Sequence, residues 1–229
     1  MSSSSSRGIG CSIGHYKITA GTLGCFVKPR KGDAVLVLSN NHVLADENGA
    51  KVGDRILQPG PHDGGRKAGD AVGKLVKFIK LKRVAANFLD VALCSVTPAI
   101  EYDTTTLTDS GKLAGLGDVV IDEGHAVSKI GRTTGLTHGR VSAFDVDNLI
   151  VEYDMGKLRF DNQIELEGTG AEPFSAGGDS GSLIVDDQLR GVALLFAGSD
   201  SGGSNGQGLT FANPLHRVLD DLKVNLLYT

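Results

Sequence analysis

The chain has 229 residues, of which 40% are hydrophobic and 22% are charged, and its formal net charge is −4. This length is enough for one large all-β domain or two small barrels. The acidic balance argues against nucleic acid as a partner, because a nucleic-acid surface needs clustered basic residues. No apolar run approaches the roughly 20 residues that cross a bilayer, so the sequence also argues against a membrane partner.

The N-terminal segment, residues 1–15, opens with a serine tract and is rich in glycine after it. We expect this segment to be disordered or extended, because polar low-complexity sequence has little to bury. It lacks the apolar stretch of a secretory signal peptide, so the sequence predicts a cytoplasmic protein unless a signal has been removed.

The three cysteines are Cys11, Cys25 and Cys94. An odd, small set is a poor disulfide framework, and reduced thiols agree with the missing signal peptide. Cys94 lies in an apolar run and is expected to be a small buried hydrophobe. A disulfide between Cys11 and Cys25 remains an alternative if the protein occupies an oxidising compartment.

Residues 16–100 break into short segments of strand character, separated by turns rich in glycine and proline. We predict strands at 24–27, 34–39, 55–57, 73–79 and 90–96. This region is assigned to an N-terminal β-barrel. Residues 101–118 lose the pattern and are expected to form a linker over the surface.

Residues 119–229 return to the strand pattern and end in one helical segment. Strands are predicted at 119–121, 126–130, 139–144, 149–153, 163–166, 182–185, 191–196 and 208–212. In the helix, Asn213 is expected at the N-cap and Pro214 at the first helical position. Short strands and turns in both halves predict two antiparallel barrels or sandwiches, so the fold class is all-β with a C-terminal α-helix.

The stretch 175–185 carries the strongest chemical signal, because glycines and Asp179 surround Ser180 just before an apolar strand. A serine hydroxyl becomes a nucleophile only when a base removes its proton, and backbone N–H groups must bind the oxyanion that forms. Flanking glycines allow the unusual backbone angles that such a loop needs. The alternative is an ordinary turn between two strands, so the interpretation depends on a base and an acid elsewhere.

A candidate base and a candidate acid occur in the first half of the chain. His42 follows an apolar strand after a short polar bend, which would hold one imidazole still. Asp90 opens another apolar strand, so its carboxylate is expected to be partly buried and to need a donor. An imidazole N–H is such a donor, and this pairing fixes the tautomer needed for base catalysis. His42, Asp90 and Ser180 would then meet where the two halves join.

Three segments, 38–45, 90–93 and 178–182, resemble the signatures of the trypsin-like (chymotrypsin-fold) serine peptidases. The stretches 129–135 and 208–214 are similar to segments of disulfide-poor bacterial members of that family. The resemblance implies two antiparallel six-stranded β-barrels, chymotrypsin-like, followed by the C-terminal helix.

The resemblance also implies a role for each site residue. Ser180 would attack the substrate carbonyl, His42 would act as general base and then acid, and Asp90 would orient His42. The backbone N–H groups of Gly178 and Ser180 would form the oxyanion hole. In many family members the residue at Asp179 receives a freshly cut N-terminal amine. No strong start of that kind is present in this chain, so another donor is expected for Asp179.

For specificity, the same resemblance places Phe174 at the base of the primary pocket. Leu195, Phe196 and Ala197 would form a wall of that pocket. No carboxylate is evident there to receive an arginine or lysine side chain, so we expect a small or apolar residue at P1, the substrate residue before the scissile bond.

We therefore predict a serine endopeptidase that acts on protein or peptide substrates through an acyl-enzyme intermediate. One alternative is a catalytically inactive peptidase-fold scaffold that binds a protein partner, and another is an esterase with the same triad. The sequence leaves the oligomeric state open. No cofactor and no metal are expected, because the cysteines and histidines lack zinc spacing and the acidic segment 145–154 lacks the pattern of a calcium loop.

Overall fold

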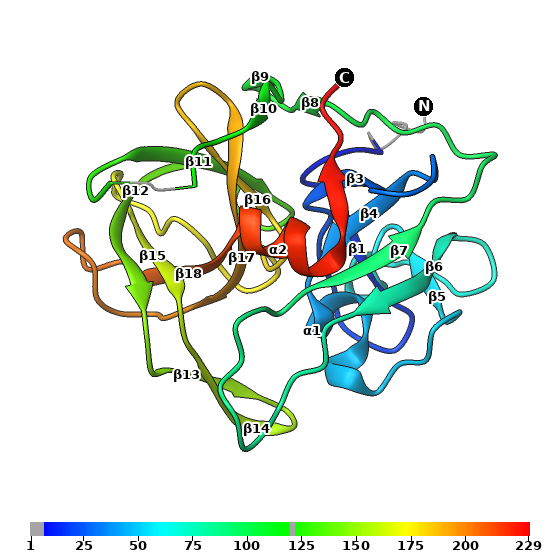
Figure 1. Cartoon of the computed structure of the whole chain (residues 1–229), viewed down its shortest axis with the longest axis horizontal. Helices are drawn as coiled ribbons and strands as arrows, with labels where there is room; N and C mark the ends of the chain where they lie inside the picture. The colour runs from blue at the N-terminus through cyan, green and yellow to red at the C-terminus, as the bar shows by residue number, and fades with distance from the viewer. Residues whose placement is uncertain (1–6, 120–121) are drawn as a thin grey trace.

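The computed structural model describes residues 7–119 and 122–229. In this part of the chain nearly all regular structure is β, and the strands form two sheets that stand side by side (Figure 1). The helical segments are short: α1 (Asn41–Leu44), α2 (Leu215–Leu222) and the 3₁₀ turns η1 (Asp46–Asn48) and η2 (Pro61–Asp63). The predicted all-β fold class with a C-terminal helix is confirmed. No helix among the described residues is long and apolar enough to span a membrane.

The first sheet is built mainly from the N-terminal half and has eight strands in the order β19-β3-β4-β7-β6-β5-β1-β2, all with antiparallel neighbours. Their bounds are β1 (Ser12–His15), β2 (Gly21–Thr22), β3 (Cys25–Pro29), β4 (Leu36–Ser39), β5 (Arg55–Leu57), β6 (Ala71–Phe78), β7 (Ala92–Ser95) and β19 (Val224–Leu226). Among the described residues, no strand pairing joins β19 to β2, so this sheet does not close. The first of the two expected barrels is therefore a curled sheet of eight strands rather than a closed ring of six.

The second sheet closes into a barrel. Its seven strands run in the order β10-β17-β16-β11-β12-β15-β18, and an additional pairing of β17 with β18 closes the ring without β10. Their bounds are β10 (Gly115–Leu116), β11 (Ala126–Gly131), β12 (Gly135–Val146), β15 (Gln163–Gly168), β16 (Leu183–Asp186), β17 (Arg190–Gly198) and β18 (Leu209–Pro214). The closed ring matches the six-stranded barrel that was predicted for this half.

Apolar packing joins the two sheets. The core of the first sheet, which contains Phe26 and Leu38, continues through Leu183 and Leu194 of the second barrel to Leu219 of α2. Because buried apolar area is the main stabilising term in folding, this shared core fixes one barrel against the other.

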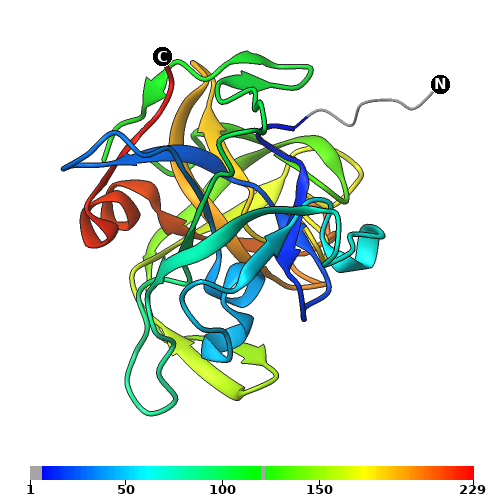
Figure 2. The same cartoon turned by 90° about the vertical axis from the view of Figure 1, so that its right-hand side faces the viewer.

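Two hairpins stand outside both sheets. The shorter one joins β8 (Thr106–Leu107) to β9 (Gly111–Lys112), and the longer one joins β13 (Leu149–Tyr153) to β14 (Gly156–Phe160). Figures 1 and 2 both show the β13–β14 hairpin at the lower edge of the molecule, where it meets the loop that follows β6. An isolated bridge between Asn87 of that loop and Phe160 fixes this contact.

The C-terminal segment returns to the first sheet. After α2, strand β19 pairs with β3, so that Leu226 lies opposite Val27. Residues 119–229 were assigned to the second barrel, and no strand was predicted at 224–226. It was missed because its alternation, with Val224 and Leu226 buried and Asn225 exposed, is only three residues long.

Short strands occur in the predicted N-terminal and linker segments. Residues 12–15 form β1 inside the first sheet, and residues 101–118 contain β8, β9, β10 and two leucines buried in the first core. Strands of two residues have no periodicity, so the sequence did not reveal them. The strand predicted at 119–121 extends over positions 120–121, which lie outside the described residues, and Val119 is exposed and belongs to no strand.

Helix α2 begins one residue later than predicted. Pro214 occupies the N-cap position, and Asn213 belongs to strand β18. Asn213 is not a cap because its buried side chain has other partners: it accepts the Asp90 backbone N–H at 2.9 Å and donates to Gln163 Oε1 at 2.6 Å. This asparagine therefore joins the second barrel to the Asp90 loop.

Two of the cysteines are buried thiols. Burial raises the pKa of Cys25 and that of Cys94 from 9.0 to about 12. Neither forms a disulfide, so the Cys11–Cys25 pairing is not present in this structure. Both thiols serve as small apolar groups in the first core.

Candidate active site

His42 lies in the short helix α1, directly after the buried strand β4. Two buried asparagines fix the backbone around it. Asn41 donates to the Ile79 carbonyl at 2.7 Å, and Asn40 donates to the Asp90 carbonyl at 2.7 Å. The imidazole is therefore attached to a backbone that side-chain hydrogen bonds hold from both sides.

Asp90 lies just before β7, and its side chain is fully buried. Its carboxylate accepts hydrogen bonds from His42 Nδ1 at 2.5 Å, from the His42 backbone N–H at 3.2 Å and from the Tyr153 hydroxyl at 2.7 Å. A buried carboxylate is costly unless donors satisfy it, and these donors do so. The structure thus brings His42 and Asp90 into direct contact.

Opposing effects act on the protonation of His42. Burial disfavours the imidazolium and by itself lowers the pKa, whereas the charge and hydrogen bond of Asp90, together with the charge of Glu47, raise it. The net result is a His42 pKa above its ordinary value of 6.5. With the Nδ1–H bonded to Asp90, Nε2 is the nitrogen left to act as a base.

Ser180 lies in the loop before β16 and lines the same cleft as His42, a cavity of about 640 Å³. Strand β13, the end of β17 and the start of β18 form most of the remaining walls. Thr22 of the first sheet fixes the loop from the other side, because its N–H donates to the Ser180 carbonyl at 2.8 Å and its hydroxyl to the Gly178 carbonyl at 3.0 Å. The structure therefore brings all three predicted residues to the junction of the two sheets.

Gly178 adopts a backbone angle that only glycine takes readily, with φ of +98°. A Cβ at this position would lie 2.2 Å from Arg132 Nη1 and 2.5 Å from Thr133 Oγ1. Any other residue would collide with these side chains and strain the loop. The positive φ and the lack of room for a Cβ thus both explain why the signature has glycine at position 178.

Side-chain hydroxyls fix the orientation of two peptide units in this loop. The carbonyl that precedes Gly178 accepts from Thr133 Oγ1 at 2.8 Å, and the carbonyl that precedes Ser180 accepts from Ser182 Oγ at 2.7 Å. The N–H and C=O of a trans peptide point in opposite directions. The N–H groups of Gly178 and Ser180 therefore face away from these hydroxyls, and among the described residues neither donates to a protein acceptor.

Asp179 has the donor that the sequence led us to expect. Its buried carboxylate lies 3.2 Å from the buried Lys129 Nζ and accepts hydrogen bonds from Thr133 N, Thr134 N, Thr134 Oγ1 and Ala176 N. Burial lowers the pKa of Lys129, and Asp179 partly offsets this effect. An internal lysine thus occupies the place for which the resemblance had implied an N-terminal amine.

The four residues expected in the specificity pocket separate into two pairs. Phe196 and Ala197 line the cleft. Phe174 and Leu195 are each 2% exposed and belong to the core of the second barrel, so their places at the base and in the wall of the primary pocket stay predictions. The Phe174 ring packs against Gly139 inside the barrel, where a Cβ on that glycine would lie 2.7 Å from Phe174 Cδ2.

Sequence reasoning missed Tyr153, Glu47 and Asn213, although each contacts or influences the His42–Asp90 pair. Tyr153 and Asn213 contact Asp90 from 63 and 123 positions away, so no local spacing could reveal them. Glu47 is only five positions from His42, but its place beside the imidazole became evident only from the structure. Lys129 did carry a signal: a lysine within the apolar strand β11 needs a buried partner.

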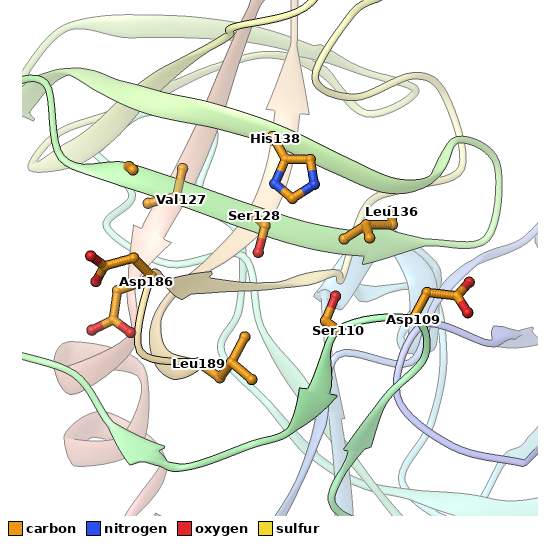
Figure 3. Close-up of a pocket in the computed structure, with 10 residues that line it drawn as sticks. Asp109, Ser110, Val127, Ser128, Leu136, His138, Asp186 and Leu189 are labelled. Carbon is orange, nitrogen blue, oxygen red and sulfur yellow. The ribbon is translucent and has the colours of Figure 1, made fainter.

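A second cavity, of about 360 Å³, lies between the β8–β9 hairpin and strands β11 and β12 and shares no lining residue with the cleft (Figure 3). Next to it, His125, Asp186 and Asp187 bring one potential metal ligand each within 4.8 Å of one another. Asp186 is already bonded to Arg190 Nε at 2.7 Å and to the Arg190 backbone N–H at 2.8 Å, and Asp187 is exposed. Protein donors therefore satisfy the buried member of this group without an ion.

The architecture is that of the chymotrypsin-like serine proteases. Thermobifida fusca protease A matches with a TM-score of 0.66 and 16% identity, over 97% of this chain and all of the other. A glutamic acid-specific serine protease matches with a TM-score of 0.66 and 20% identity, over 96% of this chain and 100% of its own. An alpha-lytic protease homologue, N4, matches with a TM-score of 0.64 and 21% identity, over 97% and 99%. At these identities the likeness establishes the fold.

No family model matches the chain. A curated relative, Protein NARROW LEAF 1 of Oryza sativa subsp. japonica, is 29% identical over an alignment 247 positions long that covers 92% of this chain. The chain spans 41% of the length of that relative.

Replacing Lys129 with methionine should destabilise the protein by about 3–5 kcal/mol, because Asp179 would remain buried without its cation. Urea denaturation measures the change in free energy of unfolding. Arg30→Ala, which removes an exposed ion pair with Asp220, is the control and should leave the midpoint almost unchanged. Equal midpoints for Lys129→Met and the wild type would contradict the structural role given to this pair.

Glu47→Gln should lower the pKa of His42, because it removes a negative charge that favours the imidazolium. A titration of the histidine signals by NMR measures this pKa directly, and Glu101→Gln, at an exposed position away from the cleft, is the control. An unchanged or raised His42 pKa in Glu47→Gln would show that Glu47 does not act on the imidazole.

Proposed function

We propose that the chain is a serine endopeptidase, with His42, Asp90 and Ser180 as its catalytic triad. The observation that carries this proposal is the buried Asp90–His42 pair, which faces a cleft that Ser180 also lines. The chymotrypsin-like fold supports it, because the solved structures with this fold named above are proteases.

In the proposed mechanism, Asp90 holds the Nδ1–H of His42, so Nε2 takes the proton from Ser180 Oγ as the oxygen attacks the substrate carbonyl. His42 then gives this proton to the leaving amine, and an acyl-enzyme remains on Ser180. His42 then takes a proton from water as the water oxygen attacks the ester carbonyl. When the bond from that carbonyl carbon to Ser180 Oγ breaks, the imidazolium gives its proton to Ser180 Oγ and the carboxylic acid product is released. The raised pKa of His42 favours the imidazolium that forms in each attack step.

The N–H groups of Gly178 and Ser180 are proposed as the oxyanion hole. Their orientation is supported by the hydroxyl contacts of Thr133 and Ser182 described above. Donors fixed before the reaction need no reorganisation as charge develops on the oxygen, and each such donor contributes roughly 3 kcal/mol in other enzymes. The Lys129–Asp179 pair would keep this loop in its competent form without proteolytic processing.

A catalytically inactive scaffold that binds a protein partner remains the alternative proposal. The similarity to NARROW LEAF 1 covers less than half of that protein, so its partners do not transfer to this chain. An esterase with the same triad is a third proposal, which the loop geometry favours less because Ser180 leads into a strand instead of a helix.

A fluorophosphonate probe should label the wild-type chain on Ser180, and Ser180→Ala should abolish the label. Peptide hydrolysis should fall at least about 10⁴-fold in Ser180→Ala and by about 10⁴-fold in Asp90→Asn, a magnitude measured in other enzymes with this triad. Ser110→Ala, at the second cavity, is the matched control and should keep full labelling. A folded wild type that takes no label would favour the scaffold.

Substrate preference should follow the apolar wall of the cleft. Phe196, Ala197, Leu209 and Phe211 line it, so small or apolar P1 residues should be preferred in a proteome-derived peptide library. Mass spectrometry of the products identifies the cleaved bonds. Cleavage confined to bonds after arginine or after glutamate would contradict this assignment of the wall.

A further inference from the structure

The β13–β14 hairpin reaches from the second barrel to the segment that carries His42. At its tip, the backbone N–H groups of Asp154 and Met155 donate to the two carboxylate oxygens of Glu47, at 3.0 and 2.8 Å. At its far strand, the Asn87 N–H donates to the Arg159 carbonyl at 2.8 Å. The hairpin belongs to neither sheet, so these contacts and its own packing hold it against the site.

Aromatic side chains pack the same hairpin against strand β17 of the second barrel. The rings of Tyr153 and Phe160 are stacked with centroids 5.9 Å apart, and the Phe160 ring lies 4.7 Å from that of Phe196 on β17. Phe160 is completely buried and Tyr153 is 9% exposed. Because such rings have few rotatable bonds and fill their space, Tyr153 has little freedom to turn its hydroxyl elsewhere.

The Tyr153 hydroxyl contacts the same carboxylate oxygen as the imidazole. It lies 2.7 Å from Asp90 Oδ2, which also accepts His42 Nδ1 at 2.5 Å, and the Tyr153 ring meets the His42 ring edge to face at 5.8 Å. Burial raises the pKa of Tyr153, and the Asp90 charge raises it further. The phenol therefore stays protonated and donates to the carboxylate.

We propose that Tyr153 is a positioning residue for the His42–Asp90 pair: its hydroxyl fixes Asp90 Oδ2 in line with His42 Nδ1 and takes up part of the carboxylate charge. The Asp90 carboxylate then receives donors from both halves of the chain, namely His42 of α1 and Tyr153 of the β13–β14 hairpin. The kinetic part of this inference rests on the proposed peptidase function. The predicted effect of Tyr153 on the pKa of His42 does not depend on that function.

The sign of that effect follows from the charges around the ring. Without the phenol, more of the negative charge of Asp90 acts on His42, and the imidazolium becomes more favourable. The other charged groups at the cleft and its neighbouring pocket are Glu47, Asp46, Asp154, Glu152 and Lys17. Tyr153→Phe changes none of these, so the Asp90 charge is the single electrostatic variable in the comparison.

The test compares Tyr153→Phe with the wild type and with Tyr102→Phe, a control that removes a tyrosine hydroxyl outside the cleft. The chain has six histidines, so the His42 signal is first assigned from the spectrum of His42→Ala. In Tyr153→Phe the pKa of His42 should rise by at least ~0.5 pH unit, and in Tyr102→Phe it should match the wild type. Protected N–H groups of Asp154 and Met155 in hydrogen exchange would verify that the hairpin is still in place.

The same variants give a kinetic readout on the peptide substrates. Turnover in Tyr153→Phe should fall about tenfold, because a hydrogen bond to a charged group is lost, with KM nearly unchanged and the acidic limb of the rate profile moved to higher pH. This direction is opposite to that expected for Glu47→Gln, so general loosening of the hairpin cannot produce both results.

Two results would overturn the inference: a wild-type His42 pKa in Tyr153→Phe with the hairpin protected, or an equal rise in Tyr102→Phe. If the wild type takes no fluorophosphonate label, the proposed function fails. The NMR comparison still decides whether Tyr153 acts on the His42–Asp90 pair.

Discussion

The buried Asp90 carboxylate is the contact around which this structure is arranged. The carboxylate receives the imidazole and the backbone N–H of His42 in α1 and the Tyr153 hydroxyl from the β13–β14 hairpin. The backbone N–H of Asp90 donates to Asn213 of β18. A charge without water is tolerated only when several donors converge on it. The segment of the first half that carries His42 and the β13–β14 hairpin of the second half must therefore both be in place before this charge is satisfied. The packing of the two halves is thereby linked to the geometry of one imidazole.

The conformation of the Ser180 loop also depends on donors that come from both sheets. Lys129 and the two threonines that follow on the β11–β12 turn hold the Asp179 carboxylate, and Thr22 of the first sheet holds the carbonyls of Gly178 and Ser180. A loop held from both barrels can keep its N–H groups oriented without a bound substrate. This arrangement supports the view that the site needs no cleaved N-terminus to become competent.

His42, Asp90 and Ser180 could be predicted from the sequence, because each lies at the boundary of an apolar run and the three follow one another in an informative order. Tyr153 could not be found in this way, since it reaches Asp90 across 63 positions of sequence and only the packed hairpin brings them together. For the fold, the longer strands were predictable from their apolar runs. Strands of two or three residues, the return of β19 to the first sheet and the burial of Leu195 depend on tertiary pairing that no local pattern encodes.

The central claim is that His42 and Asp90 make Ser180 a nucleophile beside two preformed N–H donors. A crystal structure of the chain treated with a peptide boronic acid tests it most directly, because an activated serine hydroxyl attacks boron and forms a tetrahedral adduct. We predict a covalent bond from Ser180 Oγ to boron, with a boronate oxygen within hydrogen-bond distance of Gly178 N and Ser180 N and with His42 Nε2 facing the adduct. An unmodified Ser180 in a folded chain, or an adduct whose oxygen points away from both N–H groups, would contradict the account.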